Sequence, residues 1–222
     1  MEFYSRELIA ELDEVAINKY GVSVEKLMEN AGGCVARFVI ENFSDAKRVV
    51  IVYGKGNNAG DGLVAARHLN GYGMDVKILG LNKELLNDYA KKEFDVLEKA
   101  GVLRLDNLGD LKKGDVVVDS LFGFNLNSEP GGNFRFFIEE INKARERGVK
   151  VVSVDVPSGV DSDKGEIYDC FVKADCVLML ALAKKGLKHM NNLWIGNIGI
   201  PKKVYEGLNI KPIEFKKEFF KV

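Results

Sequence analysis

The sequence of 222 residues lacks long hydrophobic runs and has no excess of charge of either sign. Its longest apolar run covers only residues 176–183, whereas a membrane-spanning helix needs roughly 20 such residues. The 32 Lys and Arg residues are balanced by 33 Asp and Glu residues, so neither nucleic acid nor a membrane surface is expected as the main partner. The opening residues, MEFYSRE, contain neither a basic stretch nor an apolar core, and we expect no signal peptide here.

Cysteine and histidine are also scarce. The three cysteines, Cys34, Cys170 and Cys176, form no CxxC pair, which indicates reduced, mostly buried thiols in a cytoplasmic protein. The two histidines, His68 and His189, belong to no recognisable Ser-His-Asp pattern. A hydrolase with a nucleophilic serine is therefore disfavoured.

What the sequence does contain is typical of a globular protein, with 46% hydrophobic and 29% charged residues. No linker or low-complexity segment divides it, so we expect a single domain over residues 1–222. Ser5 and Ser23 each precede apolar residues at helical spacing and are placed to cap two helices, the first of which ends at Gly21.

Strands and helices alternate in the remainder. Runs rich in Val, Ile and Leu predict strands at residues 48–53, 76–79, 102–105, 116–119, 149–155 and 176–182. Helical stretches separate most of them, at residues 63–69, 83–100 and 133–147. This alternation predicts a mostly parallel sheet covered by helices on both faces. Ligands of such sheets bind beyond the carboxyl ends of the strands.

Three segments that follow predicted strands carry polar side chains. Residues 54–62 (GKGNNAGDG) open a helix, where free backbone amides favour an anion or a phosphate. Asp119 ends a second strand, and Asp155 and Ser158 follow a third. Taken singly, each of these polar residues could have a purely structural role in a turn or a helix cap. Together they favour a site at one rim of the sheet, made of Asn57, Asn58, Asp61, Asp119, Asp155 and Ser158.

The glycine-rich segment matches a dinucleotide-binding pattern only loosely. Gly54, Gly56 and Ala59 fit G-x-G-x-x-A, but Asp75 lies at the start of the next strand and not at its end, where an acid would bind ribose. No Gly-Lys-Ser/Thr triplet marks a P-loop. Since the donors at the rim are oxygens without a neighbouring His or Cys, zinc is disfavoured, and a hard cation such as potassium or a divalent ion fits.

Four motifs occur in one order, at residues 27–32 (LMENAG), 56–69 (GNNAGDGLVAARHL), 119–123 (DSLFG) and 155–161 (DVPSGVD). Together they resemble the YjeF amino-terminal domain family, the NAD(P)HX epimerases, over about residues 5–205. The resemblance implies a Rossmann-like three-layer α/β/α sandwich with a mostly parallel central sheet. It implies interconversion of the R and S forms of NADHX and NADPHX, the hydrated forms of NADH and NADPH, for cofactor repair.

Partners and site residues follow from the resemblance as well. It implies a bound potassium ion held by Asn58, Asp119 and Ser158, commonly a homodimer, and an NAD(P)H-hydrate dehydratase acting downstream, expected here as a separate protein. It implies substrate contacts by Asn57, Asn58, Ala59, Gly60, Asp61, Gly123, Phe124, Asn125, Leu126, Asn127, Ser128, Glu129, Asp155 and Lys184. We further expect Asp155 to be the catalytic acid or base, because it closes a buried strand.

The sequence departs from the family pattern at two places. Residues 124–126 are FNL, where the family usually has Thr-Gly-Leu, so the phosphate-side loop is bulkier here. Residues 182–187 are LAKKGL, where the family has Ala-Pro-Lys-Pro-Gly-Leu; Lys184 is kept and both prolines are absent.

Three alternatives stay open at this point. An NAD-dependent dehydrogenase shares the fold but needs the missing ribose-binding acid. A non-catalytic nucleotide-binding or scaffold module of the same fold is the second. The third concerns residues 211–220, which are either a partner-binding arm or, as we expect from their apolar side chains, a tail docked on its own domain or on a dimer mate.

Overall fold

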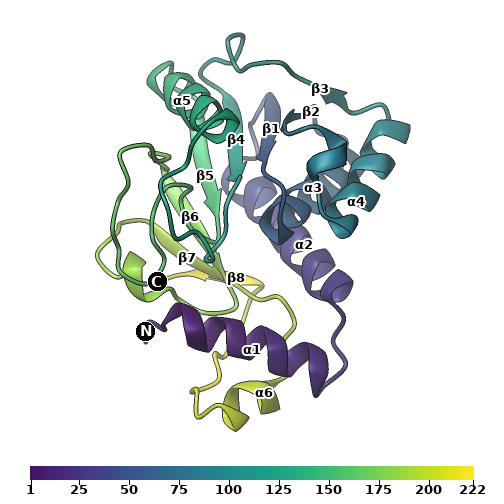
Figure 1. Ribbon diagram of the computed structural model, residues 1–222. Coiled ribbons are helices and arrows are strands. Elements are labelled where there is room, and N and C mark those ends of the chain that lie inside the picture. The colour runs from purple at the N-terminus through teal and green to yellow at the C-terminus, as the bar shows by residue number, and fades with distance from the viewer.

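The computed structural model describes residues 1–222 and contains one eight-stranded sheet with helices on both sides (Figure 1). The strand order is β3-β2-β1-β4-β5-β6-β7-β8. Neighbouring strands are parallel from β3 to β7, and β8 is antiparallel to β7. The strands are β1 Arg48–Tyr53, β2 Val76–Gly80, β3 Leu103–Arg104, β4 Asp115–Ser120, β5 Lys150–Val154, β6 Cys176–Leu180, β7 Leu193–Gly196 and β8 Phe219–Lys221. The predicted fold class, a Rossmann-like α/β protein with a mostly parallel sheet, is confirmed.

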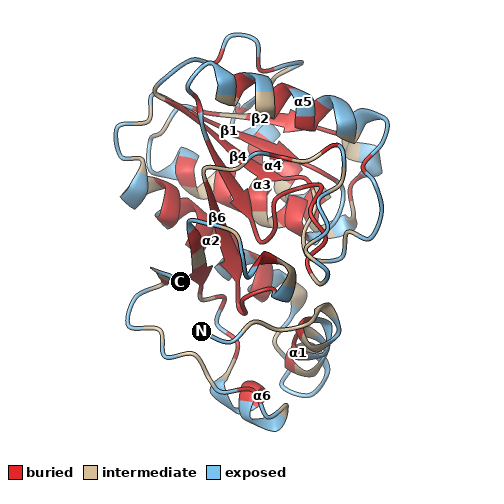
Figure 2. Ribbon diagram, turned by 90° about the vertical axis from the view of Figure 1, so that its left-hand side faces the viewer, coloured by how far each residue is buried: buried red, intermediate tan, exposed pale blue.

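The helices form layers because successive side chains of a strand point to opposite faces of the sheet. In β1, Val49 and Ile51 belong to the core packed under α2 and α3, whereas Val50 and Val52 belong to the core packed under α5. Both cores exclude solvent, so the central strands are buried on both faces (Figure 2), whereas the two residues of the edge strand β3 are exposed. The helices are α1 Arg6–Asn18, α2 Val24–Asn42, α3 Asn57–Gly71, α4 Asp88–Lys99, α5 Asn133–Glu146 and α6 Lys202–Gly207.

The first two helices begin where the sequence predicts. Ser5 accepts a hydrogen bond at Oγ from the amide of Leu8 at 3.4 Å, and Ser23 accepts one from Lys26 at 3.3 Å. Each bond satisfies an amide that the first helical turn leaves without an intrahelical partner. Both predicted caps are confirmed.

Two predicted helices have different bounds in the structure. The helix predicted at residues 63–69 already begins at Asn57, because Gly56 serves as its N-cap and most of the glycine-rich segment forms its first turns. The helix predicted at residues 83–100 is broken into a 3₁₀ turn, Lys83–Leu85, and α4. Leu86 is extended there, and the side chain of Asn87 caps α4 by accepting from Ala90 at 2.9 Å. A polar residue that competes for backbone amides thus ends one helix and starts another.

The chain after residue 183 contains elements that the sequence analysis did not predict, namely β7, α6 and β8. In β8, Phe220 pairs with Ile195 of β7, and Phe219 is buried. The tail therefore docks on its own domain, as expected. All three cysteines are free and buried, and none of the helices combines the length and the hydrophobicity that a membrane crossing requires.

The strand order reverses between β1 and β4. The chain proceeds from β1 through β2 to β3 on one side, and from β4 through β5 to β6 on the other. Crossover connections that leave in opposite directions open a crevice at the carboxyl ends of the two central strands. α1 and α6 pack against each other beyond the sheet, at the bottom of both Figure 1 and Figure 2.

Candidate active site

A cavity of about 520 Å³ lies at this crevice. One wall is helical and mostly apolar, with Ile9, Asp13 and Ile17 from α1 and Val24, Leu27, Met28 and Ala31 from α2. The other wall is formed by the residues that follow β1, β4, β5 and β6. A volume of this size is typical of a small-molecule site.

A buried ion pair between Asp155 and Lys184 stands at the sheet-side wall. The Nζ of Lys184 pairs with Oδ1 of Asp155 and also donates to the carbonyl of Leu180 at 2.6 Å. The other carboxylate oxygen, Oδ2, accepts from the amide of Phe124 at 3.0 Å. Lys184 is 1% exposed and Asp155 5% exposed, yet both line the cavity. The surrounding protein thus shields the ion pair from solvent, and the pair is accessible only from the cavity.

The backbone at this pair is strained. Asp155 and Ala181 have φ values of 68° and 60°, in the left-handed region that residues with a side chain seldom adopt. Each such residue costs about 1–3 kcal/mol and persists only where the surroundings enforce it. Here the amide of Asp155 donates to Leu178 at 2.7 Å, and the amide of Ala181 donates to Gly196 at 3.0 Å. The chain turns sharply after β5 and again after β6, and both Asp155 and Ala181 line the cavity as a result.

Asp119 and Ser158 are in direct contact behind the cavity wall. Ser158 donates from Oγ to Asp119 at 2.6 Å and from its amide at 2.9 Å. Asn58 joins them through Phe122, whose carbonyl accepts from Nδ2 of Asn58 at 2.8 Å and whose amide donates to Oγ of Ser158 at 3.1 Å. The three predicted metal ligands therefore belong to one connected network, although Asn58 does not touch Asp119 by a hydrogen bond.

The donors of this network fit a monovalent cation. Oδ1 of Asn58 is buried and has no hydrogen-bond partner. Burial raises the pKa of Asp119, while hydrogen bonds from Ser158, Ser153 and Leu121 oppose the rise. An orphaned amide oxygen and one fully buried carboxylate are oxygen donors of low total charge, which suits potassium better than a divalent ion. The structure holds no cluster of three or more His, Cys, Asp or Glu side chains able to bind a metal.

Two further acids face the cavity. Burial raises the pKa of Asp13 from 3.8 to about 6, with Lys184 lowering it and Asp155 raising it. Burial raises the pKa of Asp61 well above its usual value, and the negative charges of Asp155 and Asp13 raise it further against the effect of Lys184. Three carboxyl groups, of Asp13, Asp61 and Asp155, and two ammonium groups, of Lys55 and Lys184, therefore line the cavity.

The loop after β4 forms the rim. Gly123 packs between the other groups: a Cβ built there would lie 3.3 Å from Oδ2 of Asp155 and 3.4 Å from Cβ of Asn58. The carbonyl of Leu126 accepts from Arg6 at 2.9 Å, which ties the loop to the start of α1. Glu129 turns away from the cavity and accepts from the amides of residues 169 and 170 at 3.1 and 3.0 Å.

The predicted site residues divide into two groups in the structure. Lining the cavity are Asn57, Asn58, Asp61, Gly123, Phe124, Asn125, Leu126, Asn127, Ser128, Asp155 and Lys184. Outside it are Ala59 and Gly60, which are buried in the first turns of α3, as well as Glu129, Asp119 and Ser158.

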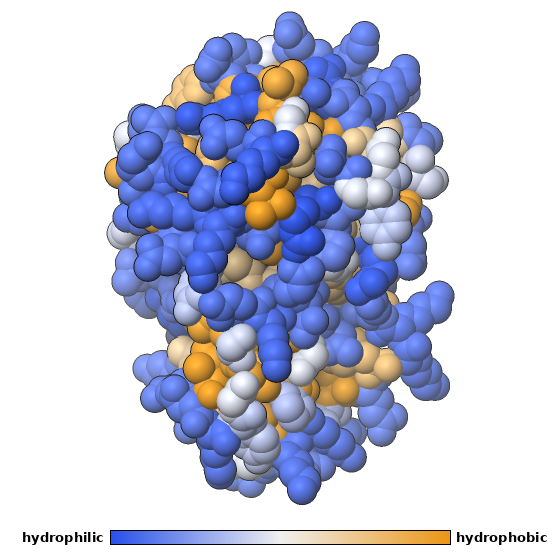
Figure 3. All heavy atoms as spheres, turned by 90° about the vertical axis from the view of Figure 1, so that its right-hand side faces the viewer, coloured by the Kyte–Doolittle hydropathy of each residue, from blue (hydrophilic) through white to orange (hydrophobic).

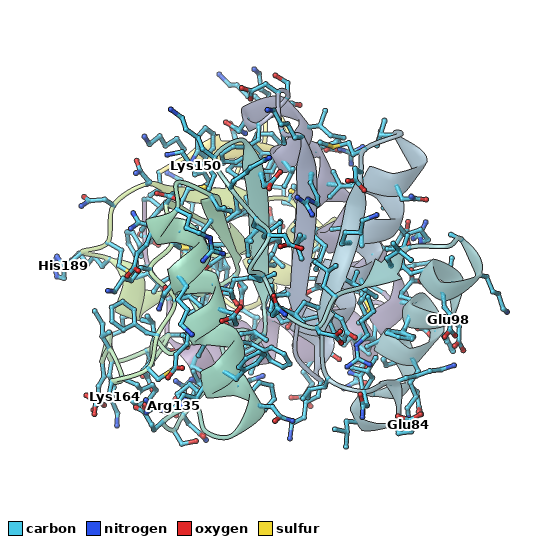
Figure 4. All side chains as sticks on the ribbon, turned by 90° about the horizontal axis from the view of Figure 1, so that it is seen from above. Glu84, Glu98, Arg135, Lys150, Lys164 and His189 are labelled. Carbon is cyan, nitrogen blue, oxygen red and sulfur yellow. The ribbon has the colours of Figure 1, made fainter.

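Sequence reasoning missed the helical wall. It placed α1 and α2 in the core and did not single out Asp13, whose only sequence signal is an acid four residues from both Ile9 and Ile17. The histidines stay outside the site: His68 bonds to Glu29 at 2.8 Å on the surface, and His189 lies at the periphery in Figure 4.

Known proteins resemble this chain over most of its length. It is 36% identical over 220 residues to a protein of Plasmodium vivax named NAD(P)H-hydrate epimerase, covering 96% of this chain and 75% of that one. It is 38% identical over 215 residues to the bifunctional NAD(P)H-hydrate repair enzyme Nnr of Thermofilum pendens, covering 90% of this chain. The chain spans only 40% of the length of that relative.

A solved structure and a family model also match this chain. The crystal structure of the yeast protein ynu0 superposes with a TM-score of 0.87 at 28% identity, covering 100% of both chains. The YjeF-related protein N-terminus family matches residues 24–186, the segment that runs from α2 through β1, the glycine-rich turn and Asp155 to Lys184. The chain therefore belongs to the YjeF-related protein N-terminus family.

Proposed function

We propose that this protein is an NAD(P)H-hydrate epimerase, an isomerase that interconverts the R and S forms of hydrated NADH and NADPH. The observation that carries the proposal is the Asp155–Lys184 pair, buried in the protein but exposed to the cavity at the carboxyl ends of the central strands. A carboxylate and an ammonium group set in a largely apolar cavity can move protons on a bound ring without any redox partner.

The substrate chemistry requires only proton transfer. The hydrated nicotinamide ring carries a hydroxyl on the carbon next to the ring nitrogen. Protonation of that hydroxyl lets the nitrogen lone pair expel water and form a planar iminium ion. Water then adds to the opposite face and loses a proton, which completes the inversion.

Asp155 is placed to exchange the proton on the ring face that points to the sheet. As a carboxylate it accepts a proton from water that adds to that face, and once protonated it returns the proton to a hydroxyl that leaves from the same face. Lys184 pairs with this carboxyl group and, together with the amide of Phe124, fixes its orientation. Proton transfer of this kind contributes about 10²- to 10⁴-fold to a rate.

Asn58, Asp119 and Ser158 would hold a potassium ion in this proposal. When bound, the ion would supply positive charge that offsets the buried carboxylate and would hold the first turn of α3, which carries Asn58. The unsatisfied Oδ1 of Asn58 and the fully buried Asp119 support this assignment. The first turns of α3 and the rim residues 123–128 would contact the substrate, with amides at the start of α3 favouring its phosphates.

Loss of inversion in one isosteric variant tests the proposal. An R-enriched NADPHX sample is incubated with the protein, and the two epimers are separated by chiral chromatography. We expect the wild type to accelerate inversion over a protein-free sample and Asp155→Asn to lose at least about 10²-fold of that acceleration. Asp169→Asn, an exposed acid outside the cavity, is the matched control and should keep full activity. Full activity of Asp155→Asn would overturn the assignment.

The structure favours the epimerase over the two alternatives. An NAD-dependent dehydrogenase needs an acid at the end of β2 to bind ribose, but β2 ends at Gly80, followed by Leu81 and Asn82. A scaffold module has no need for a strained Asp155 or for a buried Lys184. Binding of NADPH without any turnover of NADPHX would favour the scaffold.

The protein's surroundings complete the proposal. A dehydratase that acts on the S epimer would consume the product, in keeping with relatives named as bifunctional repair enzymes. Three free, buried thiols support a cytoplasmic location. We include the homodimer expected from the resemblance, which light scattering on the purified protein tests directly.

A further inference from the structure

α1 presents an acid at the centre of the face that lines the cavity. Ile9, Asp13 and Ile17 are four residues apart and therefore share one side of the helix. The α2 residues beside them on this wall are apolar. Only burial and distant charges act on Asp13; no hydrogen bond reaches its carboxyl group. An acid at a position that packing alone would fill with a hydrophobic residue calls for a functional reason.

The helix is fixed across the cavity from the sheet. At its start, the amide of Tyr4 donates to Ala183 at 2.8 Å, one residue before Lys184, and Arg6 pairs with Asp161 at 2.8 Å. Beyond its end, the hydroxyl of Tyr20 donates to the carbonyl of Lys203 in α6 at 3.3 Å. Figure 3 shows one side of this lower part of the molecule, where hydrophobic side chains gather. The position of Asp13 opposite the Asp155–Lys184 pair is thus set by contacts at both ends of α1.

We propose that Asp13 is the second catalytic acid–base of the epimerase and serves the ring face toward α1, while Asp155 serves the face toward the sheet. This inference rests on the proposed function. Inversion at one carbon needs water to leave from one face and to return to the other. A single carboxyl group on one wall reaches one face of a ring held between the two walls.

The proton balance of this scheme is closed. Protonated Asp13 gives its proton to the hydroxyl; the C–O bond breaks with its electron pair going to oxygen, and the nitrogen lone pair forms the C=N bond. Water then forms a new C–O bond on the opposite face, the electron pair returns to nitrogen, and the carboxylate of Asp155 takes the released proton. The proton returns from Asp155 to Asp13 through solvent, and the reverse reaction uses the same steps backward.

The electrostatics of the cavity suit these roles. The charged and titratable groups that act on Asp13 or are influenced by it are Asp155 and Lys184 at the sheet, Asp61 in α3 and Tyr205 in α6. Burial brings the pKa of Asp13 to about 6, so a usable fraction stays protonated near neutrality. Asp155 forms an ion pair with Lys184, whereas Asp13 has no cationic partner within hydrogen-bond distance. The two carboxyl groups therefore stand in different environments on the two walls, as paired acid and base catalysis requires.

Kinetics of Asp13→Asn test this inference. We expect kcat for inversion to fall by about 10²-fold or more with little change in KM, and the alkaline limb of the wild-type pH profile near pH 6 to disappear. Glu14→Gln, an exposed neighbour on the same helix, is the matched control and should leave both unchanged. Equal kcat and the same pH profile in Asp13→Asn would overturn the inference while leaving the epimerase intact.

Oxygen exchange separates a catalytic role from a structural one. In H₂¹⁸O, Asp155→Asn should still exchange the hydroxyl oxygen of one epimer, because Asp13 can remove and return water on its own face, but it should not invert the carbon. Asp13→Asn should do the same for the other epimer, and the double variant should do neither. Loss of exchange for both epimers in each single variant would contradict the two-face scheme. A wild type without inversion would instead overturn the proposed function, and this inference with it.

Discussion

The carboxyl group of Asp13 should make the folded protein less stable as the pH rises. Its pKa is raised by burial from 3.8 to about 6, so the folded state holds this proton more tightly than the unfolded chain. Folding stability that depends on such a proton is fully present below the unfolded pKa and is lost as the pH rises through the folded one. Replacing Asp13 by Asn removes the ionisation and keeps the shape of the side chain.

The size of the effect follows from the shift. Since each factor of ten in proton affinity is worth about 1.4 kcal/mol, ionisation of Asp13 costs the fold up to about 3 kcal/mol at pH 8. At pH 5 the same linkage gives about 1.5 kcal/mol, because the folded group is then still largely protonated. For a chain of this size, 1 kcal/mol corresponds to about 2–4 °C in Tm. Asp13→Asn should therefore melt up to about 6–12 °C above the wild type at pH 8, and by about half that margin at pH 5.

Thermal unfolding from pH 5 to pH 8 measures this directly. Glu14→Gln removes the same charge from the exposed side of α1 and should change Tm little at any pH, since surface substitutions usually stay within about 0.5 kcal/mol. A Tm difference between Asp13→Asn and wild type that does not change with pH would show that the carboxyl group of Asp13 is not buried as described. A lower Tm of the variant than of the wild type at pH 8 would show the same.

Three further outcomes are expected. Potassium chloride should raise Tm more than choline chloride at equal ionic strength, and Asp119→Asn should abolish the difference; an identical response in variant and wild type would reject this cation site. Gly62→Ala should cost about 1–3 kcal/mol in urea unfolding, because the new Cβ meets Cβ of Ser120 at 2.7 Å, whereas Gly71→Ala in the same helix meets nothing within 4 Å and should not destabilise. Arg6→Ala should weaken NADPH binding about tenfold, because α1 loses its ion pair with Asp161 at 2.8 Å; undiminished affinity would show that this anchor does not shape the cavity.

Hydrophobic pattern predicted the fold well where a segment is buried on two faces. β1 was predicted with its bounds, because the five residues that follow Arg48 in this central strand are consecutive, hydrophobic and buried. The edge of the sheet gave no such signal. β8 has only three residues and pairs with β7 on one side, so its pattern is shorter than any periodicity can establish. Leu86 and Asn87 show the other limit, since a local cap interrupts a stretch whose apolar spacing continues.

The sheet side of the site was predictable and the helical side was not. Parallel strands end at one edge, so Asn58, Asp155 and Lys184 could be placed together from strand assignments. α1 precedes the first strand and is connected to the sheet by no short turn, so its position over the cavity depends on long-range contacts such as that of Arg6 with Leu126, 120 residues apart in the chain. Sequence periodicity contains no information on such contacts.

The same geometry explains why the acid of α1 can be retained at a cost in stability. Asp155 sits in a left-handed backbone conformation and Asp13 in an apolar helical stripe, and both local choices oppose folding. They are found on facing walls of one cavity, whereas the three hydrophobic clusters of the fold are built from buried apolar side chains. Two residues on separate elements thus oppose local folding preferences at the same cavity. Such a combination is expected where binding of a substrate, and not packing, determines the residue types. Asp13→Asn should therefore stabilise the protein and slow inversion together, whereas a substitution at Asp155 also leaves the buried ammonium group of Lys184 without its partner.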